Sequence, residues 1–561
     1  MMKQLLPLLL SFALTLPAAA NAQTYDVLIT GGTIYDGTGT KPYKGEVAIS
    51  GDKIVAVGKR LRGKAKTTID AKGMAVAPGF INMLSWSNVS LIVDGKSQSD
   101  IRQGVTLEVM GEGSSMGPVN DTMRAAQLAS QSDIKFPIPW STFGGYFDFL
   151  EQKGISTNVA SFVGATTVRI HELGEGDVDP TPEQLTRMRA QVRQAMNEGA
   201  MGLGTSLIYP PAAFAETPEL IALAGEAGKC GGMYISHIRN EGNGLIPAID
   251  ELITIAREAK IPAEVYHLKQ SGEPNWGKLD AVIAKIEAAR KSGLRITADM
   301  YNYPASSTGL TASLPLWVQE GGHAKMWERL SDPAQRARVV SEMEGSSDVG
   351  ESAMNGRKAD GTLLLDFKNP ALRPLIGKTL AAVAKERGKS PSETAIDLLL
   401  EDRSRIGVAY FTMNEANVAR QTALPWMAFG SDASSSAPEG VFLLNSQHPR
   451  GYGNFARLLG KYVREEKTTS LEDAIRRLTF FPATNLGIAD TRGRLANGYF
   501  ADVVVFDPAT IADRATFEKP QQYAVGMKQV FVNGTQVLKD GEHTGATPGR
   551  FVKGPGAGKC G

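Results

Sequence analysis

This sequence of 561 residues has few cysteines, few histidines and little net charge. Its two cysteines, Cys230 and Cys560, are too few for a disulfide framework, and neither lies near a metal-ligand residue in the sequence. A formal net charge of +1, with 21% charged residues, gives no sign of a nucleic-acid partner or an anionic membrane surface. Glycines and prolines are spread along the chain, so no segment is of low complexity.

Long apolar runs are also scarce, and the one that matters lies at the N-terminus. The apolar segment 5–16 follows Lys3 and precedes the small-residue sequence Ala-Asn-Ala at 20–22. A retained membrane anchor is the alternative, but a run this short does not easily span about 30 Å of hydrocarbon. We therefore predict a cleaved signal peptide at residues 1–22, a mature start at Gln23, and a secreted or periplasmic protein with no stable membrane span.

Both ends of the mature chain have the pattern of short strands and tight turns. Strand-like segments occur at 25–30, 33–35, 45–50, 53–57, 501–506 and 529–539, with turn signals at Gly31-Gly32, Gly51-Asp52 and Asn533-Gly534. We predict that residues 23–77 and 490–561 together form a small β-sandwich domain.

The centre alternates buried strands with amphipathic helices, the pattern of a (β/α)8 TIM barrel, which we predict for residues 78–489. The predicted strands are 79–84, 105–110, 158–164, 201–207, 233–237, 263–269, 295–301 and 428–432, and the predicted helices include 182–198, 218–227 and 279–292. A long connection of about 310–425, with helical sequence at 379–387 and 392–401, separates the last two strands. Such connections are usually functional, so we expect a lid over the barrel mouth.

Two of the six histidines stand at the ends of neighbouring strands: His237 after Tyr234-Ile235-Ser236 and His267 within Glu264–Lys269. In a parallel sheet both imidazoles emerge at the carboxyl edge, where α/β barrels carry their chemistry. Either histidine alone is more often a packed or surface residue, but the pair favours metal ligation.

Several motifs resemble the metal-dependent amidohydrolase superfamily and, within it, the N-acyl-D-amino-acid deacylase (D-aminoacylase) branch, over nearly the whole mature chain. The motifs that carry the resemblance are Asp26–Gly37, Pro78–Asn82, Gly104-Val105-Thr106, Ser236–Glu241, Tyr266–Lys269, Asn275–Lys278, Tyr301–Thr308, Gly430-Ser431-Asp432 and Glu542–Gly545.

The resemblance implies that His237 and His267 hold a zinc ion and that Asp432 passes the proton of the attacking water to the leaving amine. A turn cap in segment 430–436 is the alternative for Asp432. Lys269, Tyr301 and Ser307 match the positions that face the substrate carboxylate. An ordinary solvated lysine is the alternative for Lys269. Arg239 and Arg450 are further cationic candidates of lower rank. His448 is expected near the mouth, and the other three histidines (His171, His323 and His543) are expected to serve local structure.

Two departures from the family pattern affect the metal site. Leu84 and Trp86 stand where strand one usually ends in a His-x-His pair, and Gly113 stands where the D-aminoacylase branch has a cysteine ligand. Related enzymes with a carboxylated lysine after strand four offer no alternative, because segment 201–207 has no lysine. We hypothesise that Glu112 supplies the third ligand, giving a His2Glu site with one Zn²⁺ per chain and an open position for water.

The predicted function is that of an exported zinc-dependent hydrolase of linear amides, in which metal-activated water deacylates an N-acyl-D-amino acid. Two alternatives stay open. One is an enzyme for other amides, such as N-acyl-L-amino acids, dipeptides or lipid amides. The other is a non-catalytic binding protein on the same barrel.

Overall fold

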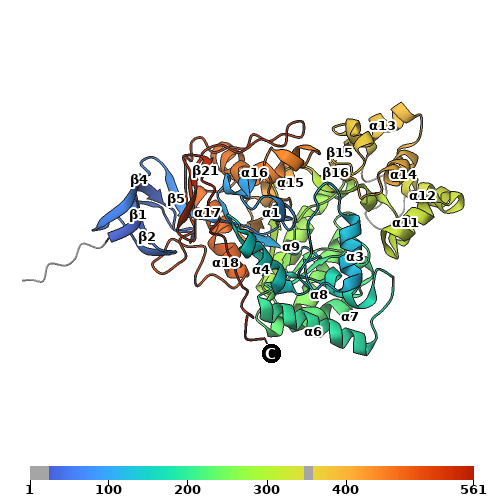
Figure 1. Cartoon of the computed structure of the whole chain (residues 1–561), viewed down its shortest axis with the longest axis horizontal. Coiled ribbons are helices and arrows are strands. Elements are labelled where there is room, and N and C mark those ends of the chain that lie inside the picture. Colours follow the sequence, from blue (N-terminus) through green and yellow to red (C-terminus); the bar gives the residue numbers. More distant parts are fainter. Residues whose placement is uncertain (1–23, 346–357, 561) are drawn as a thin grey trace, which may run out of the picture.

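The computed structural model describes residues 24–345 and 358–560, so the predicted signal peptide lies outside the described residues. A β-sheet domain, a central body of parallel strands and helices, and a largely helical insertion follow one another across the molecule (Figure 1). Within the described ranges, no helix combines the length and apolarity needed to cross a membrane.

Strands from both ends of the chain form one sheet of nine strands, in the order β21-β20-β19-β18-β5-β1-β2-β3 with β4 beside β1. The strands predicted for the small β-domain, from both ends of the chain, are thus hydrogen-bonded in one sheet. The predicted turn at Gly31-Gly32 was wrong, because β1 continues through it with a register shift after Ile29, and Gly31 accommodates this with a φ of +74°. The strands are β1 (Thr24–Ile34), β2 (Tyr43–Ser50), β3 (Lys53–Gly58), β4 (Lys64–Asp70), β5 (Ala75–Pro78), β18 (Val503–Phe506), β19 (Met527–Val532), β20 (Thr535–Lys539) and β21 (Glu542–His543).

The central strands pair in parallel as two sheets, β6-β7-β8 and β9-β10-β11-β12-β13-β17. The outer strands β6 and β17 are linked by a backbone hydrogen bond from Met83 to the carbonyl of Phe429, at 3.1 Å. Seven of the eight predicted strand segments contain an observed strand, and the eighth, 428–432, overlaps β17 (Met427–Phe429) by two residues. The bounds are β6 (Phe80–Asn82), β7 (Val105–Met110), β8 (Asn158–Ser161), β9 (Val163–Gly164), β10 (Gly202–Ser206), β11 (Met233–His237), β12 (Ala263–Val265), β13 (Ile296–Met300) and β17 (Met427–Phe429).

Helices follow the strands as predicted. The capping box of Thr181 and Gln184 begins α6, and Gly199 ends it with a φ of +117°. The helices around the central strands include α1 (Ser90–Val93), α2 (Gln98–Ile101), α3 (Asp121–Ser130), α4 (Phe143–Lys153), α5 (Ala165–Leu173), α6 (Pro182–Glu198), α7 (Thr217–Lys229), α8 (Leu245–Glu258), α9 (Leu279–Lys291), α16 (Arg450–Arg457), α17 (Leu471–Leu478) and α18 (Phe480–Asn485).

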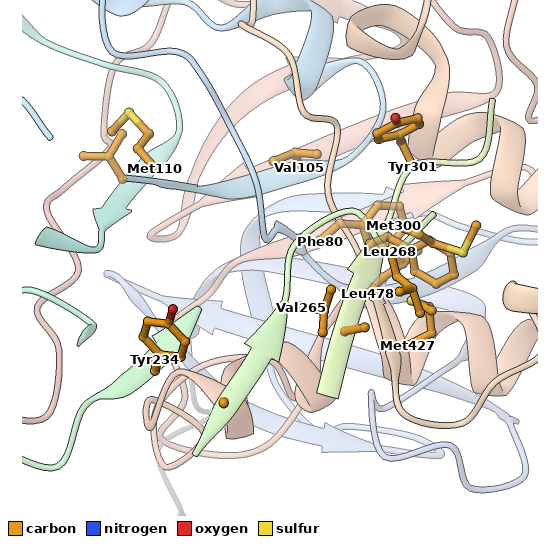
Figure 2. Packing of buried hydrophobic residues seen from close by; sticks show 14 of the residues in the cluster. Phe80, Val105, Met110, Tyr234, Val265, Leu268, Met300, Tyr301, Met427 and Leu478 are labelled. Carbon is orange, nitrogen blue, oxygen red and sulfur yellow. The ribbon is translucent and has the colours of Figure 1, made fainter. Parts of the chain in front are cut away.

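Alternate residues of the central strands belong to two different apolar clusters. Tyr234 and Val265 pack in the cluster that the helices share (Figure 2), whereas Met233 and Ile235 pack with residues of β6, β7 and β17. Side chains alternate along a strand, so His237 at the end of β11 lies on the face of Met233 and Ile235. Residue alternation therefore turns this histidine toward the interior shared by the strands.

The insertion between β13 and β17 has its own apolar core, which includes Leu310, Leu364, Leu399 and Tyr410. The two helices predicted there are present as α13 and α14. The elements are β14 (Ser306–Gly309), α10 (Leu316–Gln319), α11 (Gly322–Ser331), α12 (Pro333–Glu344), β15 (Thr362–Leu364), α13 (Leu380–Arg387), α14 (Pro391–Asp402), β16 (Gly407–Tyr410) and α15 (Glu415–Gln421).

The two cysteines are paired, contrary to the expectation of no disulfide framework. Cys230, after α7, and Cys560 form a disulfide with their Cα atoms 5.4 Å apart. The last residues reach this position along the central body, where Phe551 stacks on Phe147 and Val552 donates to the carbonyl of Val159. The 330-residue separation hid this proximity, because it depends on the path of the C-terminal tail.

Candidate metal centre

The three strand ends that carry the predicted site residues differ in backbone geometry. His237 is the last residue of β11, whereas His267 lies two residues beyond β12 with a φ of +36°. Asp432, beyond β17, has a φ of +49°. Non-glycine residues rarely adopt this left-handed conformation, and such strain is common at functional sites. The conformation at His267 changes its direction, so simple strand alternation does not predict where its imidazole lies.

Glu112 joins the two histidines at one buried point. Its Oε1 lies 2.9 Å from Nδ1 of His237 and 2.8 Å from Nε2 of His267. Potential ligand atoms of the three side chains all lie within 4.8 Å of one another. Two imidazole nitrogens and one carboxylate oxygen are a donor set that suits zinc and leaves a position for water. The residues present therefore fit the metal that the motifs imply.

Glu241 supports this group from the other side and was missed by the sequence analysis. Its Oε1 lies 3.1 Å from Nδ1 of His267 and accepts a 2.6 Å hydrogen bond from Nζ of Lys269. A carboxylate behind a histidine fixes the orientation of the ring and makes the opposite nitrogen a better ligand. Glu241 ends the motif Ser236–Glu241, four residues after His237, and this spacing could have indicated a residue close to the histidine.

Charges at the centre strongly perturb the acidic groups. Burial opposes the charged form of Glu112, but the hydrogen bonds and charges of His267 and His237 lower its pKa below the ordinary value. Burial likewise opposes ionisation of Glu241, yet Lys269 and the histidines lower its pKa well below the usual range. Burial and Lys269 act to lower the pKa of His267, but Glu112 and Glu241 outweigh them and raise it to about 10.

Asp432 is held through both carboxylate oxygens. Nε1 of Trp86 donates to Oδ1 at 3.0 Å, and Nη1 of Arg450 lies 2.9 Å from Oδ2. Burial raises the pKa of Asp432 above its ordinary value, although the Arg450 charge opposes this shift. A carboxylate with a raised pKa is a better proton acceptor than an ordinary aspartate.

The structure shows what surrounds the positions that differ from the family pattern, Leu84, Trp86 and Gly113. Leu84 is fully buried in the strand core and packs against Gly430, and Trp86 contacts Asp432. A Cβ added at Gly113 would lie 2.3 Å from Cβ of Ser206, and the φ of +69° there also disfavours a side chain. The backbone around Gly113 therefore has no room for a cysteine ligand.

Two of the three predicted substrate residues, Lys269 and Ser307, already have hydrogen-bond partners. Nζ of Lys269 is buried between Glu241 and Nδ1 of His267, and Oγ of Ser307 donates to Val408 at 2.9 Å. The Tyr301 ring lies under the Arg450 guanidinium at 4.4 Å, and its buried hydroxyl has no hydrogen-bond partner among the described residues.

The remaining candidates separate into two groups. Arg239 pairs with Glu251 at 2.8 Å and donates to the carbonyl groups of Ala213 and Ala215, so it is a structural cation. His448 accepts from the backbone N–H of Arg450 at Nδ1 and donates to a carbonyl group from Nε2. It thus supports the arginine that reaches Asp432.

Sequence comparisons relate this chain to known proteins. An amidohydrolase family profile matches residues 371–538. A D-aminoacylase of Alcaligenes xylosoxydans xylosoxydans is 33% identical over 534 residues, which cover 95% of this chain and 98% of the relative.

Solved structures of similar proteins cover the same span. A zinc-bound N-acyl-D-glutamate deacylase of Bordetella bronchiseptica, in complex with a phosphonate inhibitor, has a TM-score of 0.78 and 30% identity, and the match covers 95% of this chain and all of that one. A D-aminoacylase structure has a TM-score of 0.77 and 31% identity, and the match covers 94% of this chain and all of that one. That enzyme has a binuclear metal centre in which one metal activates and the second attenuates. These neighbours are amidohydrolases of the TIM-barrel type. Near-complete coverage at this identity makes the chain an amide-hydrolysing member of the D-aminoacylase branch of the amidohydrolase family.

Proposed function

We propose that this protein is a zinc-dependent deacylase of N-acyl-D-amino acids that releases a carboxylate and a free amino acid. The observation that carries the proposal is the convergence of Glu112, His237 and His267 within 4.8 Å at the strand ends, near enough to Asp432 that the charges of Glu112 and His267 affect its pKa. These three residues would hold one zinc ion, and Asp432 would transfer the proton of the attacking water.

The side chains divide the chemistry between them. When bound, zinc lowers the pKa of a coordinated water to about 7 and polarises the acyl carbonyl group. Glu241 and Lys269 keep the His267 ring in the orientation that presents Nε2 to the ion. Asp432 accepts the proton of the attacking water and donates it to the departing nitrogen, so the amine leaves as a neutral group.

The substrate carboxylate is assigned to the side of the opening formed by Lys269, Tyr301 and Ser307. The free hydroxyl of Tyr301 and the cationic groups beside it support this assignment. The similar proteins named above act on D-amino-acid derivatives, which supports the D configuration. The alternative substrates are N-acyl-L-amino acids, dipeptides and lipid amides, and the substrate panel described below includes them.

We also propose that the central strands form one closed (β/α)8 barrel (78–489) beside the β-domain (23–77 and 490–561), and that the insertion of about 310–425 acts as a lid. Support for the lid comes from a cavity of about 540 Å³, lined on one side by residues of the insertion and on the other by residues that follow β10 and β11. Leu314 and Leu316 come from the insertion, and Leu207 and Asn240 from the strand ends.

Export is proposed from the sequence at residues 1–22, with periplasm or medium as the destination. The Cys230–Cys560 disulfide supports it, because disulfides persist in oxidising compartments. N-terminal sequencing of protein recovered from the periplasm and the medium tests the proposal. A start at Gln23 is expected, and an intact Met1 on a cytoplasmic protein contradicts it.

The decisive experiment measures zinc per chain by plasma mass spectrometry, together with hydrolysis of a panel of N-acyl-D-amino acids, N-acyl-L-amino acids, dipeptides and lipid amides. Wild-type protein is expected to carry about one zinc, and a chelator is expected to abolish hydrolysis until zinc is restored. The double variant His237→Ala, His267→Ala should lose both zinc and activity. His323→Ala, an exposed histidine in the insertion, is the matched control and should lose neither.

Other outcomes separate the alternatives. Two metals per chain would mean that a further ligand set exists, and hydrolysis of only L-amides, dipeptides or lipid amides would replace the substrate class. No bound metal and no hydrolysis with zinc supplied would favour the non-catalytic binding protein.

A further inference from the structure

Trp86 stands where the family pattern has a metal-ligating histidine, yet it is turned toward Asp432. Its indole Nε1 donates to Oδ1 of Asp432 at 3.0 Å, while its side chain remains 37% exposed. The indole has one polar group, its N–H, and that group donates to the predicted proton carrier.

The backbone around Trp86 holds the indole in this position. The backbone N–H of Trp86 donates to the carbonyl of Ala433 at 3.1 Å, and the hydroxyl of Ser434 donates to the backbone carbonyl of Trp86 at 2.7 Å. The N–H of Asp432 in turn donates to the carbonyl of Leu84 at 2.9 Å. Backbone hydrogen bonds therefore join the segments that follow β6 and β17 on both sides of the Trp86–Asp432 contact.

The other oxygen of Asp432 is held from the opposite side. Nη1 of Arg450 lies 2.9 Å from Oδ2, and the guanidinium rests on the Tyr301 ring at 4.4 Å. The hydrogen bond to one oxygen and the ion pair to the other together restrain the carboxylate. An ionised carboxylate has about four lone-pair positions, so these two contacts leave room for a proton from water.

We propose that Trp86 is a positioning residue that orients Asp432 for proton transfer, in place of the metal contact that a histidine at this position makes possible. The indole N–H is a donor only, so it cannot exchange its role with the proton that Asp432 carries. Leu84, the other replaced position, contributes an apolar wall beside Gly430. This inference rests on the proposed function, because it concerns the orientation of the same Asp432.

The test is Trp86→Phe, which keeps a ring and removes the N–H. Loss of a hydrogen bond to a charged group predicts a fall in kcat of about 10-fold, with KM and zinc content unchanged. Trp317→Phe is the matched control, because Trp317 also donates to a carboxylate, Glu342 at 2.8 Å, in the insertion. That variant should keep the wild-type kcat.

A double-mutant cycle distinguishes orientation of Asp432 from a general structural effect. In the Asp432→Asn background, Trp86→Phe should cause almost no further loss of kcat, because the group it orients is already disabled. An equal loss in both backgrounds would overturn the proposal. A rise in KM at constant kcat would make Trp86 a wall of the substrate site and would also overturn it.

A readout without turnover keeps this inference separate from the proposed function. In metal-free protein labelled with ¹⁵N at the indole nitrogens, the signal missing in Trp86→Phe identifies Trp86. That signal should shift in Asp432→Asn, and the Trp317 signal should not. An unshifted Trp86 signal refutes the contact, even if wild-type protein proves inactive on every amide tested.

Discussion

The carboxyl ends of the central strands carry different groups around β11 and β12 than around β6 and β17. Around β11 and β12, Glu112, His237 and His267 bring ligand atoms together, and Glu241 holds one ring from behind. Around β6 and β17, Leu84 and Trp86 stand where the family pattern places ligands, and Asp432 accepts a hydrogen bond from Trp86 and forms an ion pair with Arg450. Under the proposed function, one side binds the cation and the other orients the proton acceptor.

This contrast is supported by the local backbone. Gly113 leaves no space for a larger residue beside Ser206, so the neighbouring Glu112 provides the oxygen near the histidines. On the other side, the left-handed conformation of Asp432 directs its carboxylate toward Trp86 and Arg450. A change on the first side should affect metal content, and a change on the second should affect turnover alone.

The largest effect is expected from Glu112→Ala, because it removes the carboxylate that both histidines contact. Zinc content should fall well below one per chain, and hydrolysis should fall with it. Metal analysis and the D/L panel measure this result, with the exposed Glu328→Ala as control. Unchanged zinc and activity would contradict the His2Glu assignment. Gly113→Cys added to Glu112→Ala should not restore zinc, because Ser206 blocks that position.

Asp432→Asn should separate the two sides most clearly. Replacement of a general base by an amide is expected to lower kcat by about 10²–10⁴-fold, since this is the usual contribution of such catalysis. Zinc content should stay at the wild-type value. Steady-state kinetics and metal analysis of the same sample decide the matter, and a loss of zinc in this variant would show that Asp432 is itself a ligand.

Glu241→Gln should have an intermediate effect on the cation-binding side. The amide keeps the size of the side chain but weakens its hold on His267 and Lys269. Zinc affinity is expected to fall by about 10–100-fold, which is typical for groups that orient a ligand. Competition with a chelator of known affinity measures it, and Glu251→Gln, whose partner Arg239 is structural, serves as comparison. Equal affinities for wild type and Glu241→Gln would remove Glu241 from the site.

The smallest effect on chemistry is expected from a change remote from both sides. Cys230→Ser, Cys560→Ser should leave kcat and zinc content unchanged and lower the free energy of unfolding by about 2–4 kcal/mol. Thermal or denaturant unfolding, with and without a reductant, measures the loss. Reductant should weaken wild type and have no effect on the double variant. A fall in kcat would indicate that the C-terminal tail communicates with the opening.

Much of the architecture could be predicted from local patterns. Buried β-branched runs predicted β7 and β11 with their observed bounds, and the amphipathic pattern of 182–198 predicted α6, because strand and helix patterns are short-range effects. The double glycine at 31–32 was predicted as a turn but forms a bulge within β1, since pairing with β2 on one side and with β4 and β5 on the other keeps the chain extended.

The site was predicted unevenly for a physical reason. His237, His267 and Asp432 stand at strand ends, so their positions could be predicted along with the strands. The importance of Glu241 and the Trp86–Asp432 contact could not, because each depends on side-chain directions that turns after the strands determine. The placement of Lys269 between Glu241 and His267 arises in the same way.

The sequence by itself determined the strand and helix pattern and the candidate metal histidines, since these follow from residue type and short spacing. The loss of ligands at Leu84 and Trp86 was visible in the sequence only against the pattern of the family that it resembles. Only the tertiary structure decided that Glu112 meets both imidazoles, that Trp86 and Arg450 hold Asp432, and that Cys230 pairs with Cys560. Each of these contacts joins residues far apart in the chain, and their distance is set by how the strands pair and the tail returns, which no local pattern encodes.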